Sequence, residues 1–220
     1  MGKRSYRNSS GKYFVTSIIL FIAFIIFILV LKSVDIQAIG PLESRVGLAT
    51  INGIVKDALG VHMIWYEITE VLGIVAILVA ASFALLGGYQ LITRRSLMKV
   101  DRDIIALGVF YVVVVAFYVF FEKFIVNYRP VILETELEAS FPSSHTMVAV
   151  CIMGSAMYQF YHRINNLTIR NLCVVVSGIL MVAIMGGRMI SGVHWFTDIM
   201  GGIILSGSLI FGYIGVCKKL

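Results

Sequence analysis

The chain has 220 residues, of which 59% are hydrophobic and only 14% are charged. Soluble globular domains usually carry about 25% charged residues, so this composition excludes a soluble domain and predicts an integral membrane protein. The formal net charge of +6 is explained by basic residues flanking the apolar segments, and no nucleic-acid partner is expected.

Six apolar stretches are long enough to cross the hydrocarbon core, which takes about 20 helical residues. They cover residues 14–31, 68–92, 104–121, 143–161, 171–189 and 197–216. We therefore predict an all-α polytopic membrane protein with six transmembrane helices in a bundle. The sequence between the stretches is too short for a second domain, so residues 1–220 are expected to form one membrane-embedded domain. Small residues in the last stretch predict a face for close helix packing: Gly202, Ser206, Gly207, Ser208 and Gly212.

The first apolar stretch follows a basic start and resembles a signal peptide in that respect. Its apolar run from Tyr13 to Leu31 is longer than a signal-peptide core of about 7–15 residues. No A-x-A cleavage site follows it. We expect an uncleaved first helix.

Basic residues gather in four places that share one side of a six-span protein. They are Lys3, Arg4, Arg7, Lys12, Arg94, Arg95, Lys99, Arg102, Arg163, Arg170, Lys218 and Lys219. By the positive-inside rule that side is the cytoplasm. Both termini are therefore expected in the cytoplasm of a cell-membrane protein, with the 1–2, 3–4 and 5–6 loops outside.

The 1–2 loop, residues 33–67, is the longest loop and spaces its apolar residues as a surface helix would. Such a helix could cover a site or guide a lipid headgroup, and a structural linker helix is an equally good interpretation. Glu67 and Glu70 follow where the second span begins. They could contact a substrate or pair with an arginine, and an interfacial position explains them as well.

Three polar clusters fall on the predicted outer side. The first contains Lys123 and Arg129-Pro130, whose positive charges suit a transferring phosphoryl group. The second is Pro142-Ser143-Ser144-His145. Proline is favoured at the first helical position, which would leave the next backbone amides free to bind an anion, with His145 at the rim as a proton donor.

The third cluster contains Arg188, His194 and Asp198. His194 and Asp198 are four residues apart, so on a helix they would share a face. The carboxylate could then hold one imidazole nitrogen and leave the other free to react. Arg188 offers a planar fork for phosphate oxygens.

These clusters resemble the type 2 phosphatidate phosphatase superfamily, the membrane lipid phosphatases related to vanadium haloperoxidases and glucose-6-phosphatase. The family pattern is a lysine, six residues and Arg-Pro; then Pro-Ser-Gly-His; then Ser-Arg, five residues, His, three residues and Asp. The resemblance covers nearly the whole chain and implies that His194 forms a phosphohistidine, that Asp198 orients it, and that His145 protonates the leaving group. It also implies phosphate contacts from Lys123, Arg129, Ser143, Ser144 and Arg188, and no metal or other cofactor.

The chain departs from the family pattern at three positions. Lys123 lies five residues before Arg129 and Glu122 stands in the lysine position, a shift that turns a helical side chain by about 100°. Ser144 replaces a glycine and Gly187 replaces the serine before Arg188.

The function predicted from this resemblance is hydrolysis of phosphomonoester or diphosphate groups of lipids at the outer membrane face. Undecaprenyl diphosphate is slightly favoured as substrate over phosphatidylglycerophosphate or phosphatidate, by analogy with carrier recycling. Two alternatives stay open. One is a lipid phosphotransferase that uses the same phosphohistidine, and the other is a non-catalytic membrane protein that binds an anion or lipid. Besides the lipid phosphate, the expected partners are membrane lipids.

Overall fold

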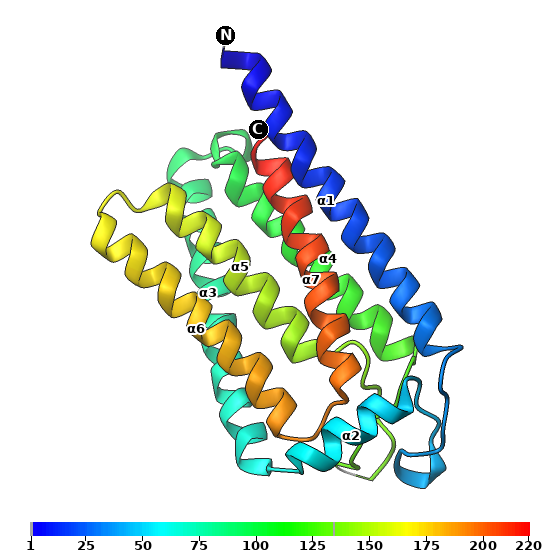
Figure 1. Cartoon of the computed structure of the whole chain (residues 1–220). Coiled ribbons are helices and arrows are strands. Elements are labelled where there is room, and N and C mark those ends of the chain that lie inside the picture. Colours follow the sequence, from blue (N-terminus) through cyan, green and yellow to red (C-terminus); the bar gives the residue numbers. More distant parts are fainter. Residues whose placement is uncertain (1, 134) are drawn as a thin grey trace.

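The computed structural model describes residues 2–133 and 135–220, with side chains from Ser10 onward. These residues form seven α-helices and two short 3-10 helices, and the predicted all-α fold is confirmed (Figure 1). The elements are α1 (Gly2–Leu31), η1 (Pro41–Glu43), α2 (Ala49–Leu59), α3 (Met63–Arg94), η2 (Leu97–Lys99), α4 (Arg102–Lys123), α5 (Ser144–Arg163), α6 (Leu167–Ile190) and α7 (Phe196–Cys217). Each of the six predicted spans corresponds to one long helix.

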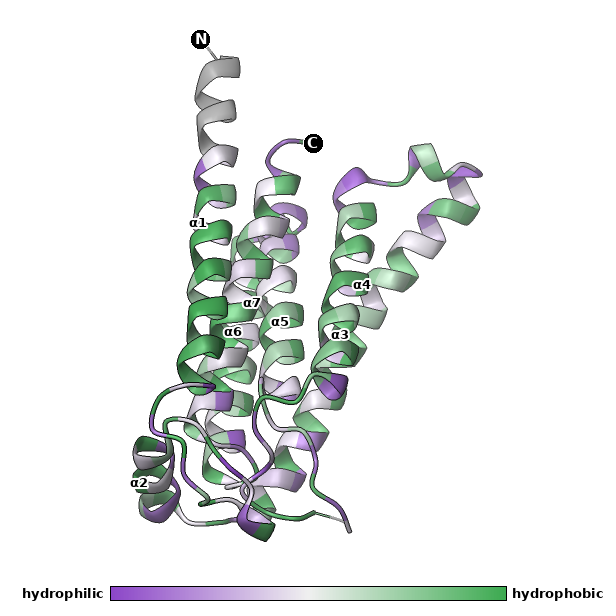
Figure 2. Ribbon diagram, turned by 90° about the vertical axis from the view of Figure 1, so that its right-hand side faces the viewer, coloured by the Kyte–Doolittle hydropathy of each residue, from purple (hydrophilic) through white to green (hydrophobic). Residues whose placement is uncertain are grey.

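Five of these six helices, α1, α3, α4, α6 and α7, are long and apolar enough to cross a membrane, among the residues described. The sixth, α5, has 20 residues, which at 1.5 Å per residue is about 30 Å. It is less apolar because it packs against α6, α7, α3 and α4 and buries ten residues, so its side chains meet protein more than lipid. Figure 2 shows the corresponding pattern, with hydrophobic helices and hydrophilic colour concentrated towards the two ends.

Helix α1 packs along α7. Gly207, Ser208 and Gly212 of the predicted close-packing face lie in this contact, whereas Gly202 and Ser206 face α5. A Cβ atom at Gly212 would lie 3.1 Å from Ser17 Oγ, and one at Gly215 would lie 3.1 Å from the ring of Phe14. Ser17 donates to the Ser208 carbonyl at 2.8 Å, and Ser208 donates to the Ser17 carbonyl at 2.9 Å. The close approach therefore depends on both the missing side chains and the paired hydroxyls.

A polar network closes the end of the bundle where both chain termini lie (Figure 1). Arg163, the last residue of α5, donates to Asp101 at 2.9 Å and to Asp103 at 2.6 Å. Asp101 also accepts from Arg94 at 2.7 Å and from Gln90 at 2.8 Å. The hydrogen bonds from Arg94 and Arg163 hold the pKa of the Asp101 carboxyl below its ordinary value. We call these five residues the inner network.

Helix α2 lies at the opposite end of the bundle, where the predicted surface helix was expected (Figure 1). Ile54 on its outer face is 63% exposed, whereas Asn52 is fully buried. The Asn52 side chain donates to Thr197 Oγ1 at 3.0 Å and accepts from the Thr197 amide at 3.1 Å. The helix therefore braces the start of α7, which supports the interpretation of this helix as a structural linker.

Candidate active site

The turn between α6 and α7 positions His194 and Asp198. Gly192 has φ +72°, and a Cβ atom there would lie 2.7 Å from the Gly60 carbonyl oxygen, so the turn requires glycine. His194 precedes the helix and is 5% exposed, while Asp198 is fully buried in the first turn of α7. The Asp198 carboxylate accepts from the Trp195 amide at 2.8 Å, an N-terminal cap.

The expectation that His194 and Asp198 share a helix face was wrong, because α7 begins at Phe196, after the histidine. The distance from His194 Nδ1 to Asp198 Oδ2 is 3.7 Å, too long for a hydrogen bond. Ser140 connects the two groups. Its hydroxyl lies 3.1 Å from His194 Nδ1 and donates to Asp198 Oδ2. The carboxylate therefore holds the imidazole through the serine, and Nε2 is left for other contacts.

The segment between α4 and α5 brings Ser140 and Arg129 to this histidine. Its two arms pair where the Arg129 amide donates to the Glu138 carbonyl at 3.1 Å and the Ser140 amide donates to the Asn127 carbonyl at 3.0 Å. Arg129 Nη1 lies 3.4 Å from His194 Nε2. Arg129 Nε also forms an ion pair with Glu138 at 2.8 Å. The guanidinium thus faces the imidazole nitrogen that Ser140 does not hold.

The start of α5 differs from its predicted form. Ser143, and not Pro142, immediately precedes the helix as its N-cap, and its hydroxyl accepts from the Thr146 amide at 3.4 Å. The Ser143 amide is not free, because it donates to the Asp198 carbonyl at 3.0 Å. The amides of Ser144 and His145 remain at the helix start, where no intrahelical acceptor exists. Ser143 therefore ties α5 to α7, and only the amides of the next two residues remain at the helix start from the predicted set of three.

Arg188, near the end of α6, and His145 meet at a third residue, Glu70 of α3. Arg188 Nη2 donates to Glu70 Oε1 at 2.5 Å, and His145 Nε2 lies 3.2 Å from both carboxylate oxygens. The Arg188 side chain is fully buried, and its Nε and Nη1 atoms have no partner within the described residues. The ring of Tyr66 lies 4.8 Å from the guanidinium carbon. Of the three interpretations of Glu70, pairing with an arginine is thus observed.

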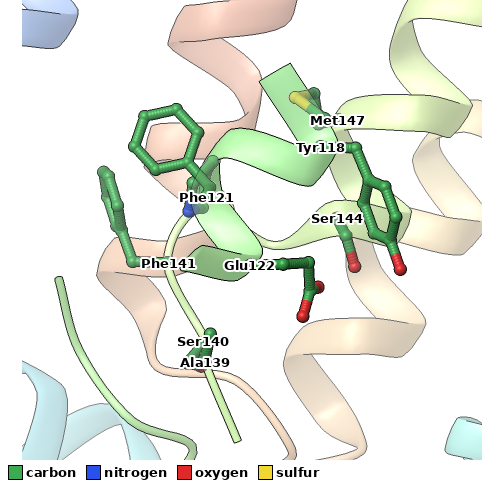
Figure 3. A pocket seen from close by; sticks show the side chains of 9 residues that line it. Tyr118, Phe121, Glu122, Ala139, Ser140, Phe141, Ser144 and Met147 are labelled. Carbon is green, nitrogen blue, oxygen red and sulfur yellow. The ribbon is translucent and has the colours of Figure 1, made fainter. Parts of the chain in front are cut away.

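Lys123 is exposed at the last residue of α4, whereas its neighbour Glu122 lines a pocket beside the site. The same pocket contains Ser140 and Ser144. Figure 3 shows the carboxylate of Glu122 and the hydroxyls of Ser144 and Tyr118 directed towards the same region. The family's lysine position thus faces the site, but an acidic residue occupies it, and Lys123 lies outside that pocket.

The close packing of α3 explains why Gly187 stands where the family has a serine. A Cβ atom at Gly187 would lie 2.4 Å from Thr69 Cγ2, and Thr69 is fully buried. The close contact of α6 with α3 therefore excludes a side chain at position 187. The same contact brings Glu70 within reach of Arg188.

The surroundings of His194 favour its neutral form. Burial and then the positive charges of Arg129 and Arg188 lower the pKa of His194 well below its ordinary value of 6.5. His194 is thus unprotonated at neutral pH and keeps a lone pair. Among the residues that the structure describes, no three His, Cys, Asp or Glu side chains are grouped so that they could hold a metal ion.

The structure therefore brings together His145, His194, Asp198, Arg129, Arg188 and Ser143, with Ser144 at the edge and Lys123 outside. Sequence reasoning gave no role to Ser140, although it precedes the Phe-Pro-Ser-Ser-His run. The arrangement can receive an oxyanion between two guanidinium groups, beside a neutral histidine that a carboxylate orients.

This fold and this site define a polytopic membrane protein in which a buried histidine and carboxylate lie beside two arginines. The chain belongs to the PAP2 superfamily, whose family model matches residues 105–219, just over half of the chain. The resemblance drawn from the three clusters is thereby confirmed, as is the multi-pass membrane character.

A sequence comparison and a structure comparison each match the chain to a protein of Bacillus subtilis. Phosphatidylglycerophosphatase B of strain 168 is 28% identical over 95 residues, which are 43% of this chain and 46% of that protein. The match thus spans less than half of that relative's length. The crystal structure of a transmembrane PAP2 type phosphatidylglycerolphosphate phosphatase covers 93% of this chain and 97% of its own, with a TM-score of 0.64 and 20% identity. At that identity the likeness establishes the fold.

Proposed function

We propose that the chain is a membrane lipid phosphatase that works through a phosphohistidine on His194. The observation that carries the proposal is the placement of this buried imidazole. Its Nδ1 is held through Ser140 to Asp198, and its Nε2 faces Arg129 at 3.4 Å. A neutral imidazole with one oriented nitrogen is the requirement for a nucleophile, and family membership points to the same chemistry.

In the first step, His194 Nε2 forms a bond to phosphorus while the bond from phosphorus to the leaving oxygen breaks. Arg129 and Arg188 stabilise the charge on the phosphoryl oxygens. Asp198 stabilises the positive charge that the imidazole gains, through the Ser140 hydroxyl.

His145 gives its proton to the leaving oxygen, which departs as an alcohol when the substrate is a phosphomonoester. In the second step, His145 takes a proton from water as the water attacks phosphorus and the bond to His194 breaks. The products are inorganic phosphate and the free enzyme. No step in this sequence uses a metal ion, so we expect activity to persist in EDTA.

The substrates we propose are lipid phosphates at the outer face of the cell membrane: phosphatidylglycerophosphate, phosphatidate and undecaprenyl diphosphate. The basic loops predict that the termini are cytoplasmic. The site lies at the other end of the bundle (Figure 1), so this topology would put it outside. A lipid phosphate as substrate is supported by the sequence similarity to a protein named phosphatidylglycerophosphatase B.

The test is phosphate release from these lipids by purified protein in detergent with EDTA, comparing wild type with His194→Ala. We expect release by wild type and loss of at least about 10³-fold in the variant. Brief incubation with labelled substrate followed by alkaline quenching should trap label on wild type alone, since phosphohistidine is acid-labile. A matched control is His62→Ala, at the start of α3. Equal release by wild type and His194→Ala would overturn the proposal.

A further inference from the structure

Glu70 places a negative charge beside the residue that we propose as the general acid. Its two carboxylate oxygens are both 3.2 Å from His145 Nε2. The carboxylate is 41% exposed as a side chain, whereas its other partner, Arg188, is fully buried. Because the leaving group must receive its proton from His145, this carboxylate stands on the leaving-group side of the pocket.

Carboxylates also balance the two arginines of the site. Arg188 is paired with Glu70 at 2.5 Å, and Arg129 is paired with Glu138 at 2.8 Å. Asp198 adds a further carboxylate behind His194. Two guanidinium groups thus face three carboxylates, and the formal charge of these five groups is −1. The guanidinium groups can hold one phosphoryl group between them, but no excess of positive charge is left for a second phosphate.

Glu122 extends this negative character to the neighbouring wall. It lines the pocket that contains Ser140 and Ser144, and its carboxylate is directed towards the Ser144 hydroxyl side (Figure 3). A lysine at this position would add a positive charge near the pocket. The glutamate instead adds a further negative charge close to the site.

We infer that the site selects lipid phosphomonoesters over lipid diphosphates, and that Glu70 is the residue that determines this preference. The inference rests on the proposed phosphatase function. A monoester releases an alkoxide oxygen that takes the proton of His145 and leaves as a neutral alcohol. A diphosphate releases a lipid monophosphate, which still carries negative charge after protonation and departs next to Glu70. Like charges repel each other, and more strongly in a partly buried site than in water.

This preference reverses the order of substrates that the analogy with carrier recycling favoured. Undecaprenyl diphosphate becomes the poorest of the three, and phosphatidate and phosphatidylglycerophosphate, which are cleaved at a phosphomonoester, become the best. The discrimination comes from a repulsive group placed where only the wrong substrate carries charge.

The experiment measures kcat/KM for farnesyl monophosphate and farnesyl diphosphate, which share one tail, in the same detergent. Wild type is expected to favour the monophosphate. Glu70→Gln keeps the shape of the side chain but removes its charge, and should move the ratio towards the diphosphate by about tenfold. Glu70→Asp keeps the charge and should preserve the direction of the wild-type preference. Glu67→Gln, on the same helix three residues earlier, is the matched control and should leave the ratio unchanged.

Wild type that cleaves the diphosphate as well as the monophosphate would overturn the inference, and so would an unchanged ratio in Glu70→Gln. If Glu70→Gln does not give a monodisperse protein, Glu122→Gln tests the same electrostatics, and a ratio unmoved towards the diphosphate counts against it. Failure of the proposed function would give a different result. In that case, His194→Ala would not reduce phosphate release from either substrate.

Discussion

The two ends of the bundle each contain a cluster of charged side chains, partly exposed at the inner network and more deeply buried at the site, and the two clusters differ in how their charges are paired. At the inner network, Arg163 distributes its donors over Asp101, Asp103 and Gln159. At the site, Arg188 is fully buried yet leaves Nε and Nη1 without a partner among the described residues. Similar residue types thus form a satisfied network at one end and an unsatisfied one at the other.

The difference supports our proposal that the end containing Arg188 binds the substrate. A buried donor without a partner costs about 1–3 kcal/mol, more when it is charged, so such atoms persist where another molecule satisfies them. Asp198 Oδ1 and His145 Nδ1 are also buried without a partner in the described structure. The inner network needs no ligand, and its ion pairs join α3, α4 and α5 instead. Substitutions at the two ends should therefore separate activity from stability.

The largest effect is expected for Asp198→Asn. The amide keeps the shape of the side chain but removes the charge that stabilises the developing imidazolium, so kcat should fall by about 10⁴-fold. The measurement is kcat on a lipid phosphomonoester, with the unfolding temperature in detergent as a check on the fold. Asp103→Asn in the inner network is the matched control and should change kcat less than twofold. A loss below tenfold in Asp198→Asn would contradict the assigned role.

Arg188→Met and Arg163→Met should have opposite consequences. Removal of Arg188 takes away a transition-state donor, so kcat/KM should fall by about 10²–10³-fold, while the unfolding temperature changes little because the lost group was incompletely paired. Arg163→Met should leave kcat/KM within about twofold and lower the stability by about 1–2 kcal/mol, a figure reduced for solvent exposure. Measurements of kcat/KM and of the unfolding temperature on both variants check these expectations. Equal destabilisation of the two variants would contradict the difference proposed between the two ends.

The pH dependence of kcat/KM should show the effect of the positive charges around His194. The nucleophile must be unprotonated, so activity is lost as the pH falls through its pKa. Because burial and Arg129 lower that pKa well below 6.5, the acid limb of kcat/KM should lie below pH 6.5. Arg129→Gln removes a charge that opposes protonation, so the limb should shift to higher pH, together with a lower maximum. A limb that stays in place would show that Arg129 does not act on His194.

The same pKa has a consequence for stability. As the pH falls below 6.5, the unfolded chain takes up a proton at this histidine before the folded protein does. The contribution of His194 to stability is therefore complete above its unfolded pKa and declines as the pH falls below that value.

The smallest effect on catalysis is expected for Gly187→Ser, which restores the family residue. Its Cβ would lie 2.4 Å from Thr69 Cγ2. We therefore expect overpacking to lower the free energy of unfolding by about 1–3 kcal/mol. Thr69→Ser removes that methyl group and keeps the hydroxyl that donates to Trp65 and Tyr66 carbonyls. The double variant should recover most of the unfolding temperature. No recovery would mean that the contact between α3 and α6 does not explain the glycine.

The sequence sufficed for the helices and for the three polar clusters, because hydrophobic length and local spacing are encoded within short segments. It did not suffice for Glu70, which lies 75 residues from His145 and 118 from Arg188, since no local pattern links residues on different helices. Ser140 was missed for a related reason. Its bridge exists only because α7 starts after His194, which places that histidine too far from Asp198 for direct contact.

Lys123 illustrates the opposite case. One residue of displacement along a helix rotates a side chain by about 100°, and this rotation was predicted from the spacing alone. Sequence could not tell whether the end of α4 would unwind to compensate. It does not, since α4 stays helical through Lys123, and Glu122 keeps the position facing the pocket.

The central helix α5 also bears on how the protein enters the membrane. Its Gln159 side chain donates to the hydroxyl of Tyr213 in α7 at 2.6 Å, and Ser155 lies 3.1 Å from the hydroxyl of Tyr111 in α4. Alone in lipid, α5 would expose these groups, which raises the cost of its insertion. We expect it to settle in the bilayer only when α6 and α7 are available to cover it. The pocket would then assemble after the last helix has been synthesised, so a chain interrupted before α7 would carry no reactive centre.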